Sequence, residues 1–203
     1  MSLHILPNRA TSGHPRPPCM RRTTPPTVRP ISICTTDGYD PIKSIHTLLY
    51  VVQRCGKRIE IARLLTMLYL SDKVHLRRYG RFICGDSYLA LRSGPVPYAL
   101  FQTLRTVRDA PTDDSDQLLA FQVTGRFVTP RFSANLDLFS ISDRECLDTV
   151  IATGRHLPLT TLQRRSRDTA FRRAPATDEM SIDMIALTLP NAQAILDYLH
   201  HRY

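Results

Sequence analysis

The sequence predicts a mainly α-helical (α+β) domain with one small β-hairpin, preceded by a disordered N-terminal tail. Apolar residues recur at helical spacing in several segments bounded by capping residues, whereas only one short segment alternates apolar and polar residues on both sides of a turn. Seven prolines fall within the first 36 residues, and no internal repeat is visible. At 203 residues the chain is long enough for one well-filled core. We therefore expect a tail at 1–37 and a single domain at 38–203.

The predicted tail is basic and rich in proline. Residues 1–36 contain five arginines and no acid, so they carry more than half of the chain's net charge of +9. Prolines interrupt helices and strands, and apolar residues are too sparse to offset the entropy of ordering. The tail is therefore expected to be disordered, and Met20 is an alternative translation start within it. A basic tail accelerates association with an acidic partner without specifying which partner it is.

Two long helices are expected after the tail. Asp40 and Pro41 form an N-cap and a first-turn proline, and the apolar spacing that follows continues until Gly56. A second, longer helix is predicted from about Glu60 to Arg78. Gly80 suits the left-handed position after its end.

The third predicted helix follows a short apolar segment and two prolines. Residues 88–91 read as a strand or an extended segment, and Pro97 is expected to begin a helix that ends near Asp109. The intervening Gly94-Pro95-Val96-Pro97 is interpreted as a rigid corner that fixes how the second and third helices pack. The alternative is that this corner presents a groove to a partner segment.

The C-terminal half is expected to contain a hairpin and several shorter helices. After an acidic loop at 111–117, residues 119–123 and 127–129 flank a turn at Gly125 and predict a β-hairpin. Ser142 and Glu145 have the spacing of a capping box, which would open a helix ending at Gly154. Short helices are predicted near 160–167, 181–188 and 191–202.

Composition and motifs argue against several functions. The five cysteines are single and odd in number, so neither a disulfide framework nor a zinc site is predicted. Without an apolar run of about 18–20 residues or a secretory signal, we expect a cytoplasmic protein with no membrane segment. No G-x-S-x-G motif or glycine-rich phosphate loop occurs, so we expect neither an enzyme nor a cofactor. Asp72 and His75 share a helix face but lack further ligands at a recognisable spacing, which favours a hydrogen-bonded histidine over a metal site.

Residues 68–97 combine a helix end, a Gly-Asp turn and a double-proline step, and in this order they resemble one family. The family is the Panacea domain, or SocA-like antitoxin domain, which is related to phage-associated proteins. The similarity covers roughly residues 40–188. The matching residues, which are also the candidate partner-binding residues, are Tyr69, His75, Leu76, Tyr79, Gly80, Gly85, Asp86, Tyr88, Gly94, Pro95, Val96 and Pro97.

The resemblance implies the antitoxin of a bacterial type II toxin–antitoxin system, which neutralises a cognate protein toxin by direct binding. It further implies that such a protein can act as an adaptor to an ATP-dependent protease. From the residues themselves we add a candidate basic contact surface made of Lys73, Arg77, Arg78 and Arg81. This surface, together with a second arginine group near 164–173, keeps open the alternative of a DNA-binding autoregulator, although no recognition-helix pattern is present.

Overall fold

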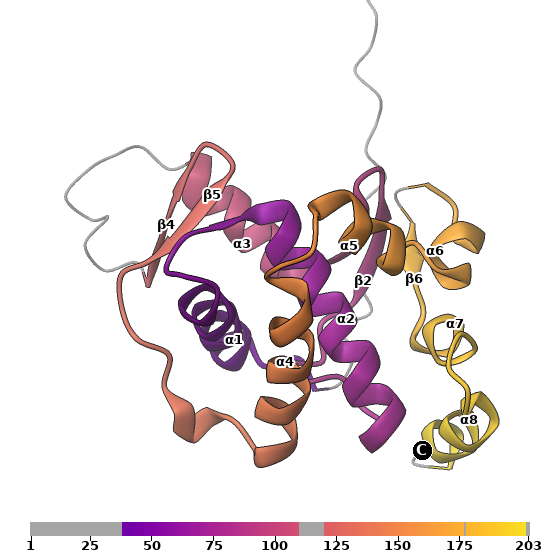
Figure 1. Cartoon of the computed structure of the whole chain (residues 1–203). Coiled ribbons are helices and arrows are strands. Elements are labelled where there is room, and N and C mark those ends of the chain that lie inside the picture. Colours follow the sequence, from indigo (N-terminus) through magenta and orange to yellow (C-terminus); the bar gives the residue numbers. More distant parts are fainter. Residues whose placement is uncertain (1–37, 110–119, 177, 202–203) are drawn as a thin grey trace, which may run out of the picture. The chain divides into compact units, whose positions relative to one another are not determined.

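A computed structural model describes residues 38–109, 120–176 and 178–201 (Figure 1). The predicted tail and the acidic loop at 111–117 lie outside these described residues. Within the described residues the chain forms eight α-helices and two three-stranded antiparallel sheets. The predicted class, mainly α with some β, is confirmed, although the sheet content is larger than the single hairpin that we expected.

The two long helices begin and end close to their predicted residues. α1 spans Pro41–Arg54, and the carboxylate of Asp40 caps it by accepting a hydrogen bond from the backbone N–H of Lys43 at 2.9 Å. α2 spans Ile61–Tyr79 and ends at Gly80, whose φ of 69° is left-handed. Capping and periodicity act locally, which is why both helices are readable from the sequence.

The predicted proline corner is instead a β-strand. β2 (Tyr88–Leu91) pairs antiparallel with β3 (Gly94–Pro97), and helix α3 begins one residue later, at Tyr98–Asp109. β3 lies at an edge of its sheet, whose strand order is β3-β2-β6. The backbone N–H of Tyr98 donates to the Ser87 carbonyl, so by the alternation of an antiparallel ladder the nitrogens of Pro95 and Pro97 face the outer edge. Prolines are tolerated there because no ladder hydrogen bond is lost.

The predicted hairpin is present and has a third strand. β4 (Phe121–Thr124) and β5 (Phe127–Pro130) flank the turn at Gly125, and the two-residue β1 (Ile59–Glu60) pairs with β5. A short 3₁₀ turn, η2 (Leu136–Leu138), leads from this sheet to α4 (Ile141–Gly154). β1 is too short to give a periodic signal, so it was missed.

The capping box of α4 is shifted by two residues from the predicted one. Ser140, not Ser142, is the N-cap, and its hydroxyl accepts from the backbone N–H of Asp143 at 3.1 Å. The Asp143 carboxylate in turn accepts from the backbone N–H of Ser140 at 2.9 Å. Both serines have a suitable residue three positions later, and it is Asp143 that closes the box, while its carboxylate also contacts side chains of α1 and α2.

The C-terminal elements are short. They are α5 (Leu159–Ser166), α6 (Thr169–Arg173), β6 (Glu179–Met180), α7 (Ile182–Ala186) and α8 (Ala192–His200). β6 adds antiparallel to β2, and α7 and α8 contact α2 (Figure 1). α5, α7 and α8 confirm the predicted short helices, whereas α6 and β6 were not predicted.

Buried apolar side chains form two clusters that share α2. The larger cluster joins α1, α2, α3, α4 and the β1-β5-β4 sheet, with Leu64 and Leu68 among the contributions from α2. The smaller cluster joins Tyr69 and Leu76 of α2 with β2, β6 and the C-terminal helices. α2 is therefore the central helix of the described residues.

Candidate partner-binding site

Most of the family-motif residues are part of the core. Nine of the twelve are buried, Gly80 and Gly85 are half-buried, and only Tyr79 is exposed. The rings of Tyr69 and Tyr88 meet edge to face with their centroids 5.0 Å apart. The motif therefore builds the scaffold, and binding of a partner through these residues stays a prediction.

Asp72 organises the turn that follows α2. Its carboxylate accepts a hydrogen bond from the Tyr88 hydroxyl at 2.6 Å and from the backbone N–H of Ile83 at 2.8 Å. Burial raises the pKa of Asp72 to about 6, although both hydrogen bonds favour the charged form. Asp72 thus ties α2 to β2 across the Tyr-Gly and Gly-Asp motifs.

Asp86, the acid of the Gly-Asp turn, caps α3. Its two carboxylate oxygens accept from the backbone N–H groups of Ala99 at 3.0 Å and Leu100 at 3.1 Å. Burial raises the pKa of Asp86, whereas these backbone hydrogen bonds act in the opposite direction. A helix N-terminus holds an anion favourably, so Asp86 serves the start of α3.

Gly85 lets two backbone segments approach closely. Its φ of 69° is left-handed, and a Cβ at this position would lie 2.5 Å from the carbonyl oxygen of Gly38. Only glycine fits both conditions.

His75 and Asp143 form the centre of a buried ion cluster. Asp143 is fully buried, and its carboxylate oxygens lie 2.6 Å from Lys43 Nζ, 3.1 Å from His75 Nε2 and 3.3 Å from Arg81 Nη2. Burial alone would raise the pKa of Asp143, but the hydrogen bonds from His75, Lys43 and Ser140 outweigh burial and hold that pKa well below its usual range. The cluster joins α1, α2 and α4.

The histidine is hydrogen-bonded, as expected, and its partners come from outside its own helix. His75 Nδ1 lies 2.9 Å from the Arg81 carbonyl oxygen, and Nε2 faces the Asp143 carboxylate. Asp72 does not contact these two atoms, so the expected Asp72–His75 face is divided between two networks. No group of three His, Cys, Asp or Glu side chains within the described residues is placed to hold a metal ion.

The predicted basic surface is divided by the fold. Lys73 Nζ lies 2.5 Å from Asp168, and Arg81 belongs to the buried cluster, so the charges of both are paired. Arg77 and Arg78 remain exposed on the last turn of α2. Asp168 also accepts from the Tyr69 hydroxyl at 2.8 Å. Two of the four cations are therefore held in ion pairs within the domain, which leaves Arg77 and Arg78 as the exposed part of the predicted surface.

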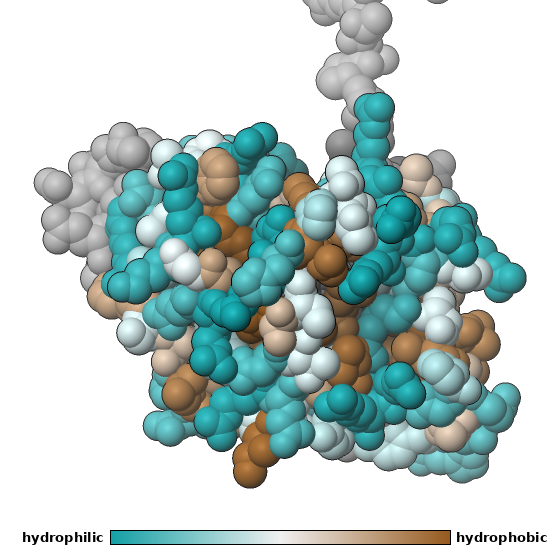
Figure 2. Space-filling model, viewed as in Figure 1, coloured by the Kyte–Doolittle hydropathy of each residue, from teal (hydrophilic) through white to brown (hydrophobic). Residues whose placement is uncertain are grey.

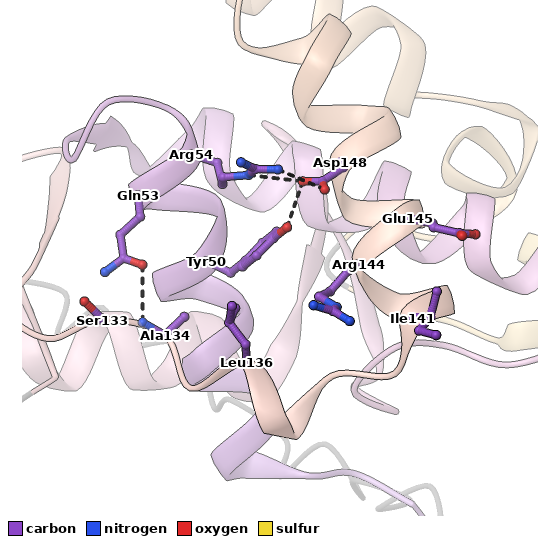
Figure 3. Close-up of a pocket in the computed structure, with 10 residues that line it drawn as sticks. All are labelled: Tyr50, Gln53, Arg54, Ser133, Ala134, Leu136, Ile141, Arg144, Glu145 and Asp148. Carbon is purple, nitrogen blue, oxygen red and sulfur yellow. Dashed lines mark hydrogen bonds and ion pairs between the residues drawn. The ribbon is translucent and has the colours of Figure 1, made fainter.

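Exposed apolar side chains lie beside α1 and α4, in a region that the sequence reasoning missed. A hollow of about 600 Å³, here called the α1–α4 hollow, contains Leu136 and Ile141, which are 48% and 70% exposed. Figure 3 shows Tyr50 and Arg54 of α1 pointing toward Asp148 of α4, with dashed lines from both side chains to its carboxylate.

A polar network forms one side of this hollow. The Tyr50 hydroxyl donates to Asp148 at 2.9 Å, and Arg54 pairs with the same carboxylate at 3.0 Å. Figure 2 shows that apolar side chains occur as separate spots among hydrophilic ones on this face of the molecule. Leu136 and Ile141, two exposed apolar side chains beside these fixed polar groups, make the hollow a candidate contact surface. No periodic pattern marked Leu136 and Ile141 as exposed, because α4 is only weakly amphipathic and Leu136 lies in the turn before it.

The described helices do not include one long and apolar enough to cross a membrane. The fold and these surfaces define a mainly α-helical domain in which the Tyr-Gly and Gly-Pro-Val-Pro motifs are internal and a short apolar surface is exposed.

A family model described as antitoxin SocA-like, Panacea domain, matches residues 64–170, and the chain therefore belongs to this antitoxin-like family. The match covers α2 to the start of α6 and includes every candidate motif residue. Neither the curated proteins nor the solved structures give a match.

Proposed function

We propose that this protein is the antitoxin of a type II toxin–antitoxin system and that it neutralises a cognate protein toxin by direct contact, without acting as an enzyme. Membership of the antitoxin SocA-like family is the observation that carries this proposal. The α1–α4 hollow is the proposed contact surface. A partner that covers an exposed apolar side chain such as Ile141 removes its apolar area from water, and this favours binding.

The proposal is tested with the reading frame that neighbours this gene. Expressed alone, it is expected to arrest growth, and co-expression of the full-length protein is expected to restore growth. The two proteins should also purify together. A neighbouring frame that is harmless, or a toxin that full-length protein neither binds nor neutralises, would contradict the proposal.

A matched pair of variants tests the contact surface. Ile141→Lys places a charge in the α1–α4 hollow, whereas Leu187→Lys changes another exposed aliphatic residue, 58% exposed, that does not line it. Loss of a central apolar contact costs more than about 1 kcal/mol, so we expect Ile141→Lys to weaken toxin binding at least about fivefold. Leu187→Lys should bind like the wild type, and equal binding by both variants would exclude the hollow.

We further propose that binding delivers the toxin to an ATP-dependent protease, which the family resemblance supports. The half-life of the toxin should then shorten when the protein is present. An unchanged half-life, together with restored growth, would limit the mechanism to occlusion.

A further inference from the structure

A group of exposed arginines lies where α5, α6 and the β2–β3 turn meet. Residues 155–176 contain six arginines and a single acid, so they carry a net charge of +5, whereas residues 37–203 as a whole carry +4. α6 follows α5 closely along the chain, and α5 contacts β3 (Figure 1). The exposed arginines of this region, here called the α5–α6 arginine surface, are Arg92, Arg164, Arg165, Arg167, Arg172 and Arg173.

Hydrogen bonds to neutral acceptors hold part of this surface together. Arg167 Nη2 donates to the carbonyl oxygens of Arg92 at 3.1 Å and Ser93 at 3.3 Å, across 75 and 74 positions of the sequence. Arg172 donates through Nη1 to the Arg167 carbonyl and through Nη2 to the Thr169 hydroxyl, both at 3.2 Å. These contacts orient two guanidinium groups, but a carbonyl or hydroxyl acceptor leaves their charge uncompensated.

The acids of this region do not neutralise the arginines. Asp168 pairs with Lys73 and caps α6. Asp178, the next acid along the chain, lies beside β2, because its carbonyl accepts from the backbone N–H of Ala90 at 3.0 Å, and its carboxylate accepts from the backbone N–H of Glu179. None of the six arginines forms an ion pair with another described residue. Their charge therefore favours an anionic partner.

The surface has the chemistry of a nucleic-acid contact. The large apolar side chains that are exposed elsewhere in the described residues include none from 155–176. Protein interfaces have an apolar centre that is depleted of charge, whereas interfaces with DNA are polar and strongly positive. Single strands are held by bases that stack on aromatic rings, and Phe171, the one aromatic residue of this stretch, is half-buried against the smaller core cluster. Double-stranded DNA fits these features best.

We propose that the α5–α6 arginine surface binds the phosphate backbone of double-stranded DNA without reading its sequence. A guanidinium group donates two parallel hydrogen bonds to a phosphate, and each neutralised phosphate releases counterions. Arg164 and Arg165 lie on the last turn of α5, whereas a recognition helix reads bases with its N-terminal residues. The inference goes beyond the proposed function and does not depend on it, since this surface shares no residue with the α1–α4 hollow.

The test measures binding of the full-length protein to a fluorescein-labelled DNA duplex of about 20 base pairs by fluorescence anisotropy. Arg164, Arg165 and Arg173 make no side-chain hydrogen bond or ion pair within the described residues, so they can be changed without breaking a contact. Arg164→Gln/Arg165→Gln/Arg173→Gln should weaken binding at least about tenfold at about 100 mM salt. It should also make the slope of log K against log salt shallower by about 2–3.

The matched control is Lys57→Gln/Arg58→Gln/Arg105→Gln, which removes three exposed bases that form no ion pair within the described residues and lie outside the surface. Both triple variants lose the same charge, and the N-terminal arginines are present in both. The control should therefore bind within about threefold of the wild type. An equal loss in the two variants would mean that binding follows net charge alone, and this would overturn the inference.

A single variant tests whether the fold assembles the surface. Arg92→Gln keeps the carbonyl that accepts from Arg167 and removes one charge from the β2–β3 turn. We expect it to weaken duplex binding about three- to tenfold, because one phosphate contact is lost. Unchanged binding would contradict the surface as defined. Thermal unfolding checks that each variant folds like the wild type.

Unlabelled competitors decide the class of partner. The unlabelled duplex should displace the labelled one at least about tenfold better than a poly-glutamate peptide of equal charge or a single strand of equal length does. Equal competition by poly-glutamate would assign the surface to an acidic protein segment, and stronger competition by the single strand would assign it to unpaired nucleic acid. Either result would overturn the inference.

Discussion

Replacing Asp143 with asparagine should destabilise the domain by about 3 kcal/mol. Breaking a buried ion pair by removing one partner costs about 3–5 kcal/mol, because a charge is left buried without compensation. Lys43 and His75 are 14% and 0% exposed in their side chains, so neither reaches water without rearrangement. Arg81 is 40% exposed and can turn to solvent, and asparagine keeps an oxygen for the backbone N–H of Ser140. Both effects place the expected loss of stability near 3 kcal/mol, the lower limit of this range.

The measurement is urea unfolding followed by circular dichroism at pH 7, supported by thermal unfolding. A loss of about 3 kcal/mol corresponds to a fall in Tm of about 6–12 °C for a domain of this size. Asp148→Asn is the matched control, because it makes the same change on the same helix. Asp148 is 39% exposed and its partner Arg54 is 55% exposed, so the control should lose less than about 1 kcal/mol.

The reasoning is refuted if Asp143→Asn loses no more than the control does. The acid dependence gives a second check. Because the pKa of Asp143 is depressed in the folded state, its contribution is present above its unfolded pKa and is lost as the pH falls through the folded pKa. The free energy of unfolding of Asp143→Asn should therefore fall less than that of the wild type when the pH is lowered.

Three other perturbations have defined outcomes. The pKa of Asp72 is raised to about 6, so its contribution to stability is present below the unfolded pKa and is lost as the pH rises. Urea titrations of the wild type should therefore show a loss of about 2 kcal/mol between pH 4.5 and 7.5, and Asp72→Asn should lack that loss. Tyr88→Phe removes the donor to that carboxylate and should cost about 1–3 kcal/mol at pH 7, and a cost below 0.5 kcal/mol would mean that water replaces the hydroxyl. Gly85→Ala should cost more than about 2 kcal/mol because its Cβ would meet the Gly38 backbone, whereas Gly125→Ala, with a similar φ but open space, should cost about 1 kcal/mol; equal Tm values for the two variants would contradict the packing argument.

Local signals made the helices predictable from the sequence. The N-cap of α1 and the left-handed glycine after α2 each depend on neighbouring residues only. The strand β3 could not be read in this way, because its prolines also fit a helix start. Pairing with β2 decides the outcome there, and pairing is a tertiary property.

The candidate site was less accessible to sequence reasoning than the fold was. The motif residues were found, but their burial shows that they build the scaffold. Lys43 and Asp143 are 100 positions apart, and Lys73 and Asp168 are 95 apart, so no spacing rule connects them. The same applies to the α1–α4 hollow, since it is lined by segments that are distant in the sequence.

The position of β6, α7 and α8 has a consequence for which parts of the domain tolerate change. β6, α7 and α8 contact the other elements mainly through α2 and β2, and they take no part in the ion cluster around Asp143. Apart from Asn191, which donates to the Arg77 carbonyl, exposed positions of 178–201 can therefore be substituted without breaking the hydrogen bonds of the central helix. The C-terminal elements can therefore be altered while the ion cluster that joins α1, α2 and α4 keeps its geometry.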